Sequence, residues 1–197
     1  NVRTYANIGE TDFSFESWSN AVRAGRTYTS SGPLLSFYVD GKQPGDELSM
    51  RGKGGSVQIN AEAISLTGPI HKLDVVYNGQ VLTSVENKKG STSLKINDVI
   101  RVPGSGWLAA RCVSEHKAWS VWPQHIAAHT SPVFVKVPGE DLFDNETAEY
   151  LITVMEGGMA WLDTLATRST PKRDSAVKSI FEEALVSIRA KQHHHGH

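Results

Sequence analysis

The 197-residue chain contains a single cysteine, Cys112, and carries almost no net charge. One thiol cannot form an internal disulfide, and it cannot supply the cysteine cluster of a zinc or iron–sulfur site. The 20 Lys and Arg residues against 21 Asp and Glu residues give a formal charge of −1. A nucleic-acid clamp needs surplus positive charge to displace counterions from phosphates, so we expect no nucleic-acid partner.

Long hydrophobic runs are also missing. No stretch of about 18 apolar residues is present, so we expect no membrane partner. The chain begins at Asn1 without the charged and apolar regions of a signal peptide, which is typical of a mature product or an excised fragment. Residues 193–197 hold four of the eight histidines and are interpreted as a tag remnant or a metal-binding tail.

Residues 1–25 predict an N-terminal segment that ends in a short helix. Ser14 can cap a helix on which Phe15, Trp18 and Val22 share one apolar face. Gly25 follows as the residue that ends it, because glycine readily adopts the left-handed conformation found just after helices.

From residue 26 to residue 139 the apolar pattern changes to a period of two. Eight short runs rich in β-branched and aromatic residues are separated by turn residues, and Asn78-Gly79 is typical of a tight hairpin. The runs are 26–30, 34–40, 56–65, 70–77, 80–86, 93–96, 107–114 and 132–137. No helix separates them, which favours antiparallel pairing and predicts a mainly β fold, an immunoglobulin-like β-sandwich.

Residues 140–192 predict a C-terminal helical hairpin. The period of 3.6 residues returns, with Asn145 as the cap of a helix that reaches about Arg168. Gly157 and the glycine after it are expected to kink this helix. Pro171 suits the first position of a second helix.

The densest group of reactive side chains lies in the segment 115–131, which we expect to be a long loop. Its members are His116, Trp119, Trp122, His125 and His129. The three histidines are candidate ligands of a metal ion. The two tryptophans, with His116, are candidate ligand-binding residues for a carbohydrate, because aromatic rings can stack on sugars. The alternative is that these side chains simply pack over the core.

Other catalytic patterns are missing. Neither a G-x-S-x-G nor an S-x-x-K motif is present, and no H-E-x-x-H sequence accompanies the histidines. Cys112 lies in an apolar run and is interpreted as a small buried hydrophobe rather than a nucleophile. We therefore assign no catalytic residue.

Two consecutive stretches carry a resemblance to a known family. Residues 18–35 read WSNAVRAGRTYTSSGPLL, and residues 39–46 read VDGKQPGD. This pair resembles the C-terminal region of PHP-type metallohydrolases of the CehA/McbA-like branch, and residues 3–5, 106–111 and 128–134 fit the same pattern. The match spans about residues 1–140.

The resemblance implies a division of labour between two domains. In that family a PHP barrel carries divalent metal ions on its own motifs, and those motifs are absent from this sequence. The chain would then be a non-catalytic accessory domain without a cofactor of its own, with the upstream PHP domain of the same polypeptide as its partner. A periplasmic or extracellular location would be in keeping with the family.

Three functions are therefore open. The first is the accessory β-sandwich domain of a PHP-like metal-dependent hydrolase. The second is a carbohydrate- or ligand-binding module that uses Trp119, Trp122 and His116. The third is an independent metal-dependent hydrolase that uses His116, His125 and His129.

Overall fold

The computed structural model describes residues 2–52, 54–118, 124–140, 143–167 and 170–195. The chain divides into two compact units, Asn1–Glu140 and Asp141–His197. No helix in the described ranges is both long and apolar enough to cross a membrane.

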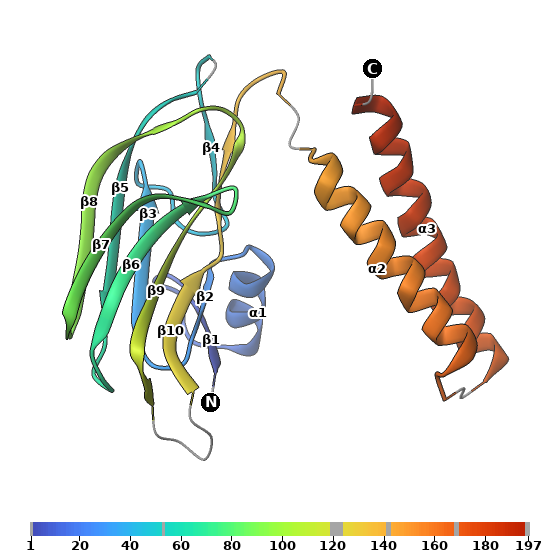
Figure 1. The fold of residues 1–197 in the computed structure, drawn as a ribbon, viewed down its shortest axis with the longest axis horizontal. Coiled ribbons are helices and arrows are strands. Elements are labelled where there is room, and N and C mark those ends of the chain that lie inside the picture. The colour runs from blue at the N-terminus through green and yellow to red at the C-terminus, as the bar shows by residue number, and fades with distance from the viewer. Residues whose placement is uncertain (1, 53, 119–123, 141–142, 168–169, 196–197) are drawn as a thin grey trace. The chain divides into compact units, whose positions relative to one another are not determined.

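The first unit is built from two β-sheets and one helix, α1 (Phe15–Arg23) (Figure 1). Within its described residues the large sheet contains β1 (Arg3–Ala6), β2 (Thr27–Ser30), β4 (Glu47–Ser49), β6 (Ile70–Tyr77), β7 (Gln80–Ser91), β9 (Gly106–Ala118), β10 (Gln124–Thr130) and β11 (Val133–Lys136). The small sheet contains β3 (Leu34–Val39), β5 (Gly55–Ile64) and β8 (Ser93–Val102). The expected mainly β fold is thereby confirmed.

The core lies between the two sheets. Side chains alternate along the strands between buried and exposed, as in β3, where every second residue is buried. Phe37 and Ile59 from the small sheet meet Leu73 and Leu108 from the large one, and all four are almost fully buried. Burial of each such side chain contributes about 1.5–3 kcal/mol of transfer free energy.

Strand β9 organises the large sheet. It pairs with β6 along one edge, and with β10 and β11 in succession along the other. One pair is parallel, β11 with β4, so the expectation of purely antiparallel pairing was wrong. A parallel pair needs a long connection rather than a helix as such, and here the strands between β4 and β11 provide it.

The predicted N-terminal helix is confirmed. The Ser17 N–H donates to the Ser14 side chain at 3.0 Å, and the chain leaves the helix at Gly25 with φ of +71°. The turn at Gly45 packs directly on the end of this helix, since a Cβ on Gly45 would lie 1.8 Å from the carbonyl oxygen of Ala24. The motif of residues 18–46 therefore joins α1 to the sheets.

The predicted hairpin at residues 78–79 is also confirmed, with φ of 45° at Asn78 and 85° at Gly79. The predicted long loop over residues 115–131 was wrong. Most of it continues β9 and forms β10, because Ile126, Ala128 and Thr130 alternate as buried residues with outward-facing neighbours. The polar histidines between them obscured this period of two.

The second unit is an α-hairpin of α2 (Asn145–Thr164) and α3 (Pro171–His195). Pro171 begins α3 as predicted, and α2 runs as one helix through Gly157 and Gly158. The cap of α2 is Asp144 rather than Asn145, because its carboxylate accepts the Thr147 N–H at 2.9 Å. Hydrogen bonds from the hydroxyl and N–H of Thr147 lower the pKa of Asp144.

Candidate functional site

The outer face of the large sheet, opposite the core, carries a polar row. Its members lie in register on six neighbouring strands: Thr4, Thr29, His129, Arg111, Asp74 and Ser84. The row exists because every second residue of a strand points to the same face, and antiparallel pairing aligns these positions across strands.

Asp74 is the nearly buried centre of this row, with 2% of its surface exposed. One carboxylate oxygen accepts the Ser84 hydroxyl at 2.8 Å, and the other accepts the Arg111 Nε–H at 3.0 Å. The Lys72 ammonium lies 3.6 Å from the first oxygen and 3.0 Å from Glu86. A buried carboxylate requires hydrogen-bond or ion-pair partners. The charges of Asp74 and Glu86 are balanced by those of Lys72 and Arg111.

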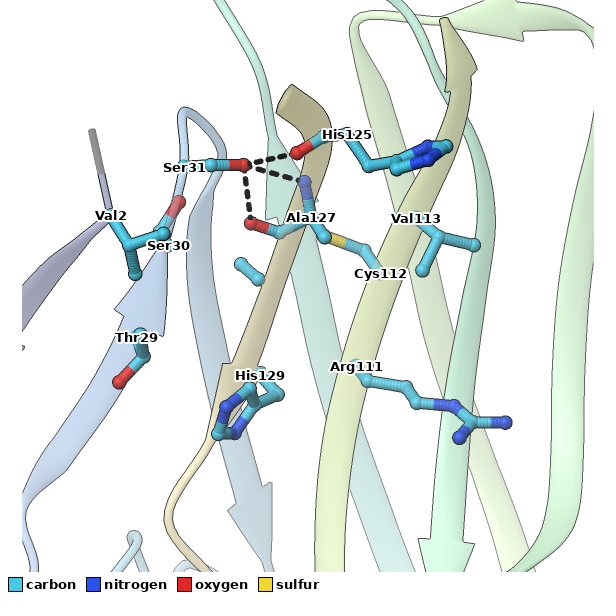
Figure 2. A pocket seen from close by; sticks show the side chains of 11 residues that line it. Val2, Thr29, Ser30, Ser31, Arg111, Cys112, Val113, His125, Ala127 and His129 are labelled. Carbon is cyan, nitrogen blue, oxygen red and sulfur yellow. Dashed lines mark hydrogen bonds between the residues drawn. The ribbon is translucent and has the colours of Figure 1, made fainter. Parts of the chain in front are cut away.

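Two shallow hollows flank the polar row and share Arg111 and His129. Figure 2 shows the first of them. The first has a volume of about 610 Å³, and Ala127 is among its lining residues. Its polar lining comes from hydroxyl, imidazole and guanidinium groups, with no carboxylate among its lining residues. The second, of about 520 Å³, is lined by apolar side chains that include Val76, Trp107 and Phe134.

The predicted histidines are only partly brought together. His125 and His129 both line the first hollow, and Figure 2 shows their rings at its opposite ends. They belong to one strand, where four residues at a rise of about 3.3 Å span roughly 13 Å. The Ser31 hydroxyl occupies the space near them by donating to the His125 carbonyl at 2.7 Å.

The other candidate residues lie outside the described part of the chain. This applies to Trp119, to Trp122 and to the side chain of His116, whose backbone belongs to β9. Among the side chains that are described, no group of three His, Cys, Asp or Glu residues could hold a metal ion. The metal and carbohydrate sites therefore stay predictions.

Cys112 is fully buried in the core, as predicted. Desolvation raises the pKa of its thiol to about 11, against a smaller opposing effect of a hydrogen bond with the Ala128 backbone. The reactive species is the thiolate, so a protonated thiol without solvent access is inert at neutral pH.

A second outward-facing feature lies at α1. Phe13 and Phe15 are 83% and 82% exposed, Trp18 and Val22 are 38% and 36% exposed, and only Ala21 of the helix is buried. We call Phe13, Phe15, Trp18 and Val22 the α1 apolar face. The sequence predicted that three of these residues share a face, but not that the sheets leave it uncovered.

No protein-family model, curated protein or solved structure matches the chain. The assignment therefore depends on the residues themselves. Sequence reasoning missed the Asp74–Arg111 pair, although one signal was available. An aspartate inside the otherwise apolar run of residues 70–77 indicates a carboxylate that must find partners when the strand is buried.

Proposed function

We propose that the chain is a non-catalytic accessory module, an immunoglobulin-like β-sandwich that packs against the catalytic domain of a PHP-like metal-dependent hydrolase. The observation that carries this proposal is the α1 apolar face. Four large apolar side chains lie exposed at or beside one short helix, outside the core that the two sheets bury between them. Contiguous exposed apolar surface is typical of a protein interface.

The energetics of α1 support the same conclusion. A helix of nine residues is marginal on its own and depends on tertiary packing. Here it is held by its C-terminal end, through the contact with Gly45 and the Arg26 N–H bond to the Ala21 carbonyl at 3.0 Å. On the apolar side, Phe13 and Phe15 remain almost wholly in water, and Trp18 and Val22 keep 38% and 36% of their surface exposed. A partner domain that buried it would gain about 1.5–3 kcal/mol for each large side chain fully removed from water.

The stretch that carries the family resemblance supplies two members of this surface, Trp18 and Val22. The stretch from residue 18 to residue 46 contains the second half of α1, the glycine that ends it and the turn that packs on it. A motif located in such a junction is expected where a module meets its neighbour. This supports the accessory role within a PHP-like hydrolase.

The chemistry of the described side chains is also in keeping with a non-catalytic role. The Cys112 thiol is inert, and the Asp74 carboxylate is engaged by Ser84 and Arg111. In this proposal the metal ions and the reaction belong to the upstream domain.

The proposal is tested by comparing this chain with the polypeptide encoded by its complete reading frame. We expect metal-dependent phosphoesterase activity in the longer polypeptide only. We also expect slower hydrogen exchange in α1 of the longer polypeptide, because the α1 apolar face is then covered. Metal-dependent hydrolysis by this chain after removal of residues 193–197, or equal exchange of α1 in both polypeptides, would contradict the proposal.

A second candidate function, carbohydrate binding, draws on the first hollow. The hollow offers hydroxyl and imidazole groups, and its lining includes residues of β9 and β10, the strands joined by the segment that contains Trp119 and Trp122. Titration with a panel of oligosaccharides, followed by tryptophan fluorescence, tests it. Saturable quenching that is lost in a His129→Ala variant would support the candidate, and a flat response would exclude the tested sugars.

A further inference from the structure

The second hollow on the outer face of the large sheet has two chemically different ends. Its volume is about 520 Å³. At one end lie Trp107 of β9 and Phe134 of β11, which are opposite each other in the register. At the other end lie Arg111 of β9 and His129 of β10, which are also register partners. The hollow therefore joins an aromatic end to a polar end.

Small side chains keep the middle of the hollow open. Residues 107, 109 and 111 share one face of β9, and Ala109 presents only a methyl group between its two larger neighbours. The register partner of Ala109 on β6 is Val76, which also lines the hollow. Nothing lies within 4 Å of a Cβ added to Gly79, at the β6–β7 turn. An apolar ring can therefore lie over Ala109, since a hollow of this volume is typical of small-molecule sites.

The polar end presents positive charge. The Arg111 guanidinium has five N–H donors, and within the described chain only the one on Nε is engaged, by Asp74. The carboxylate of this pair is 97% covered, whereas half of the arginine side chain reaches solvent. Figure 2 shows the guanidinium pointing away from the His129 ring, which leaves the space between the two side chains open. The exposed part of the ion pair is therefore its cationic part.

Carboxylates are kept away from the hollow. The described residues that line it include no Asp or Glu. Glu47 is the register partner of Phe134, but its carboxylate lies 2.7 Å from the Lys136 ammonium. Asp74 is engaged by Arg111 in the same way. The Nη donors at the polar end are therefore available to an acceptor from outside the chain.

We propose that the second hollow binds a small amphipathic carboxylate, with its apolar body over Ala109 against the aromatic end and its acid group on the Nη groups of Arg111. A carboxylate and a guanidinium form charge-assisted hydrogen bonds in a planar fork. Aromatic side chains favour stacked or edge-to-face contacts with an apolar ring. The two ends lie four residues apart on β9, roughly 13 Å between Cα atoms. This length fits one ring and a short spacer before the acid group, and such binding is independent of the accessory function.

The first experiment titrates the full chain, isotopically labelled for NMR, with trans-cinnamate and with its neutral amide, trans-cinnamamide. Heteronuclear spectra give both the Kd and the location of the ligand. We expect cinnamate to bind in the millimolar range that is typical of so small a ligand, with shifts centred on Gly79, Ala109 and Phe134. It should bind about tenfold more tightly than cinnamamide, because only the acid gains the charge-assisted contact with Arg111. Acetate, which lacks the apolar body, should bind more weakly than cinnamate.

Matched leucine variants test which hollow is used. Ala109→Leu fills the middle of the second hollow from an outward-facing position, and its Kd for cinnamate should rise by about tenfold or more. Ala127→Leu is the control, because Ala127 lines the first hollow and not the second. The control should bind cinnamate as the wild type does, and well-dispersed spectra show that both variants keep the fold.

A double variant tests the contact with the acid group. Asp74→Asn combined with Arg111→Gln removes both charges of the pair and leaves two amides that can bond to each other. This variant should bind cinnamamide as the wild type does, and the preference of about tenfold for cinnamate should be lost.

Four results would overturn the proposal. Cinnamate shifts that do not saturate in the millimolar range, or that are centred elsewhere, would exclude this site. Equal wild-type affinity for cinnamate and cinnamamide would exclude recognition of the acid group. An unchanged Kd in Ala109→Leu, with the fold intact, would show that the ligand does not lie over that residue. A preference for cinnamate retained in the double variant would exclude Arg111 as its partner.

Discussion

The Arg111 guanidinium on β9 donates from Nε to the carboxylate of Asp74 on β6, at 3.0 Å. The two residues lie opposite each other in the register of the large sheet, and the acid is 97% covered while half of the arginine side chain reaches solvent. The pair thus links β6 and β9 on the outer face of the large sheet. The apolar core stabilises only the opposite face. Its strength can be measured.

Asp74→Ala should lower the free energy of unfolding by about 1–3 kcal/mol, since the donors of Ser84 and Arg111 lose a covered acceptor. Urea denaturation followed by tryptophan fluorescence gives the value. The matched control is Glu62→Ala, which breaks the more exposed ion pair with Lys95 and should cost less than about 0.5–1 kcal/mol. Equal losses in both variants would contradict the structural role of the Asp74 pair.

Gly45→Ala should destabilise the first unit much more than Gly41→Ala. Both glycines have a positive φ, 90° and 76°, so both variants pay a similar backbone cost of about 1 kcal/mol. Only at Gly45 would the new Cβ collide with the Ala24 carbonyl oxygen, whereas nothing lies within 4 Å of that position at Gly41. Hydrogen exchange of α1 should rise in the Gly45 variant alone, and similar exchange in both would show that the close contact is unimportant.

Alkaline pH should weaken the fold through Cys112. Burial raises the pKa of its thiol to about 11, so above the unfolded value, near 9, the unfolded chain releases a proton that the folded chain retains. The stabilising contribution is complete below pH 9 and is lost as the pH rises towards 11, by up to about 2–3 kcal/mol.

The measurement for Cys112 is the free energy of unfolding of wild type and Cys112→Ala at pH 8 and at pH 10.5. Tyr28 and Tyr77 also have raised pKa values, because of burial first, and both variants share their effect. The decrease between the two pH values should therefore be smaller without the thiol. Identical decreases would mean that the thiol does not titrate differently in the folded state.

Local signals in the sequence predicted the local features well. The Ser14 cap, the Gly25 end of the helix, the Asn78-Gly79 turn and the start of a helix at Pro171 depend on backbone preferences within a few residues. Asp144 took the place of the predicted Asn145 as the cap because both residue types suit that position almost equally. Which of the two residues caps the helix depends on the path of the chain before the helix.

Features that depend on distant residues could not be predicted. Strand β4 has only three residues and exists because β11 pairs with it. Strand β10 was hidden because histidine is not typical of strands, although its neighbours alternate. The pairing of Asp74 with Arg111 requires the register of β6 on β9, and a single sequence carries no direct signal for that register.

The parallel pairing of β4 with β11 has a consequence for how the protein is made. Six strands separate the two in the sequence. Strand β2 likewise pairs with β10, which follows it much later in the chain. During synthesis the early strands therefore emerge without their final neighbours, and the large sheet closes only after Lys136 has left the ribosome. Contacts between such distant residues make folding slow, so the nascent chain exposes one edge of β2 and one of β4 to other chains until β10 and β11 have been made.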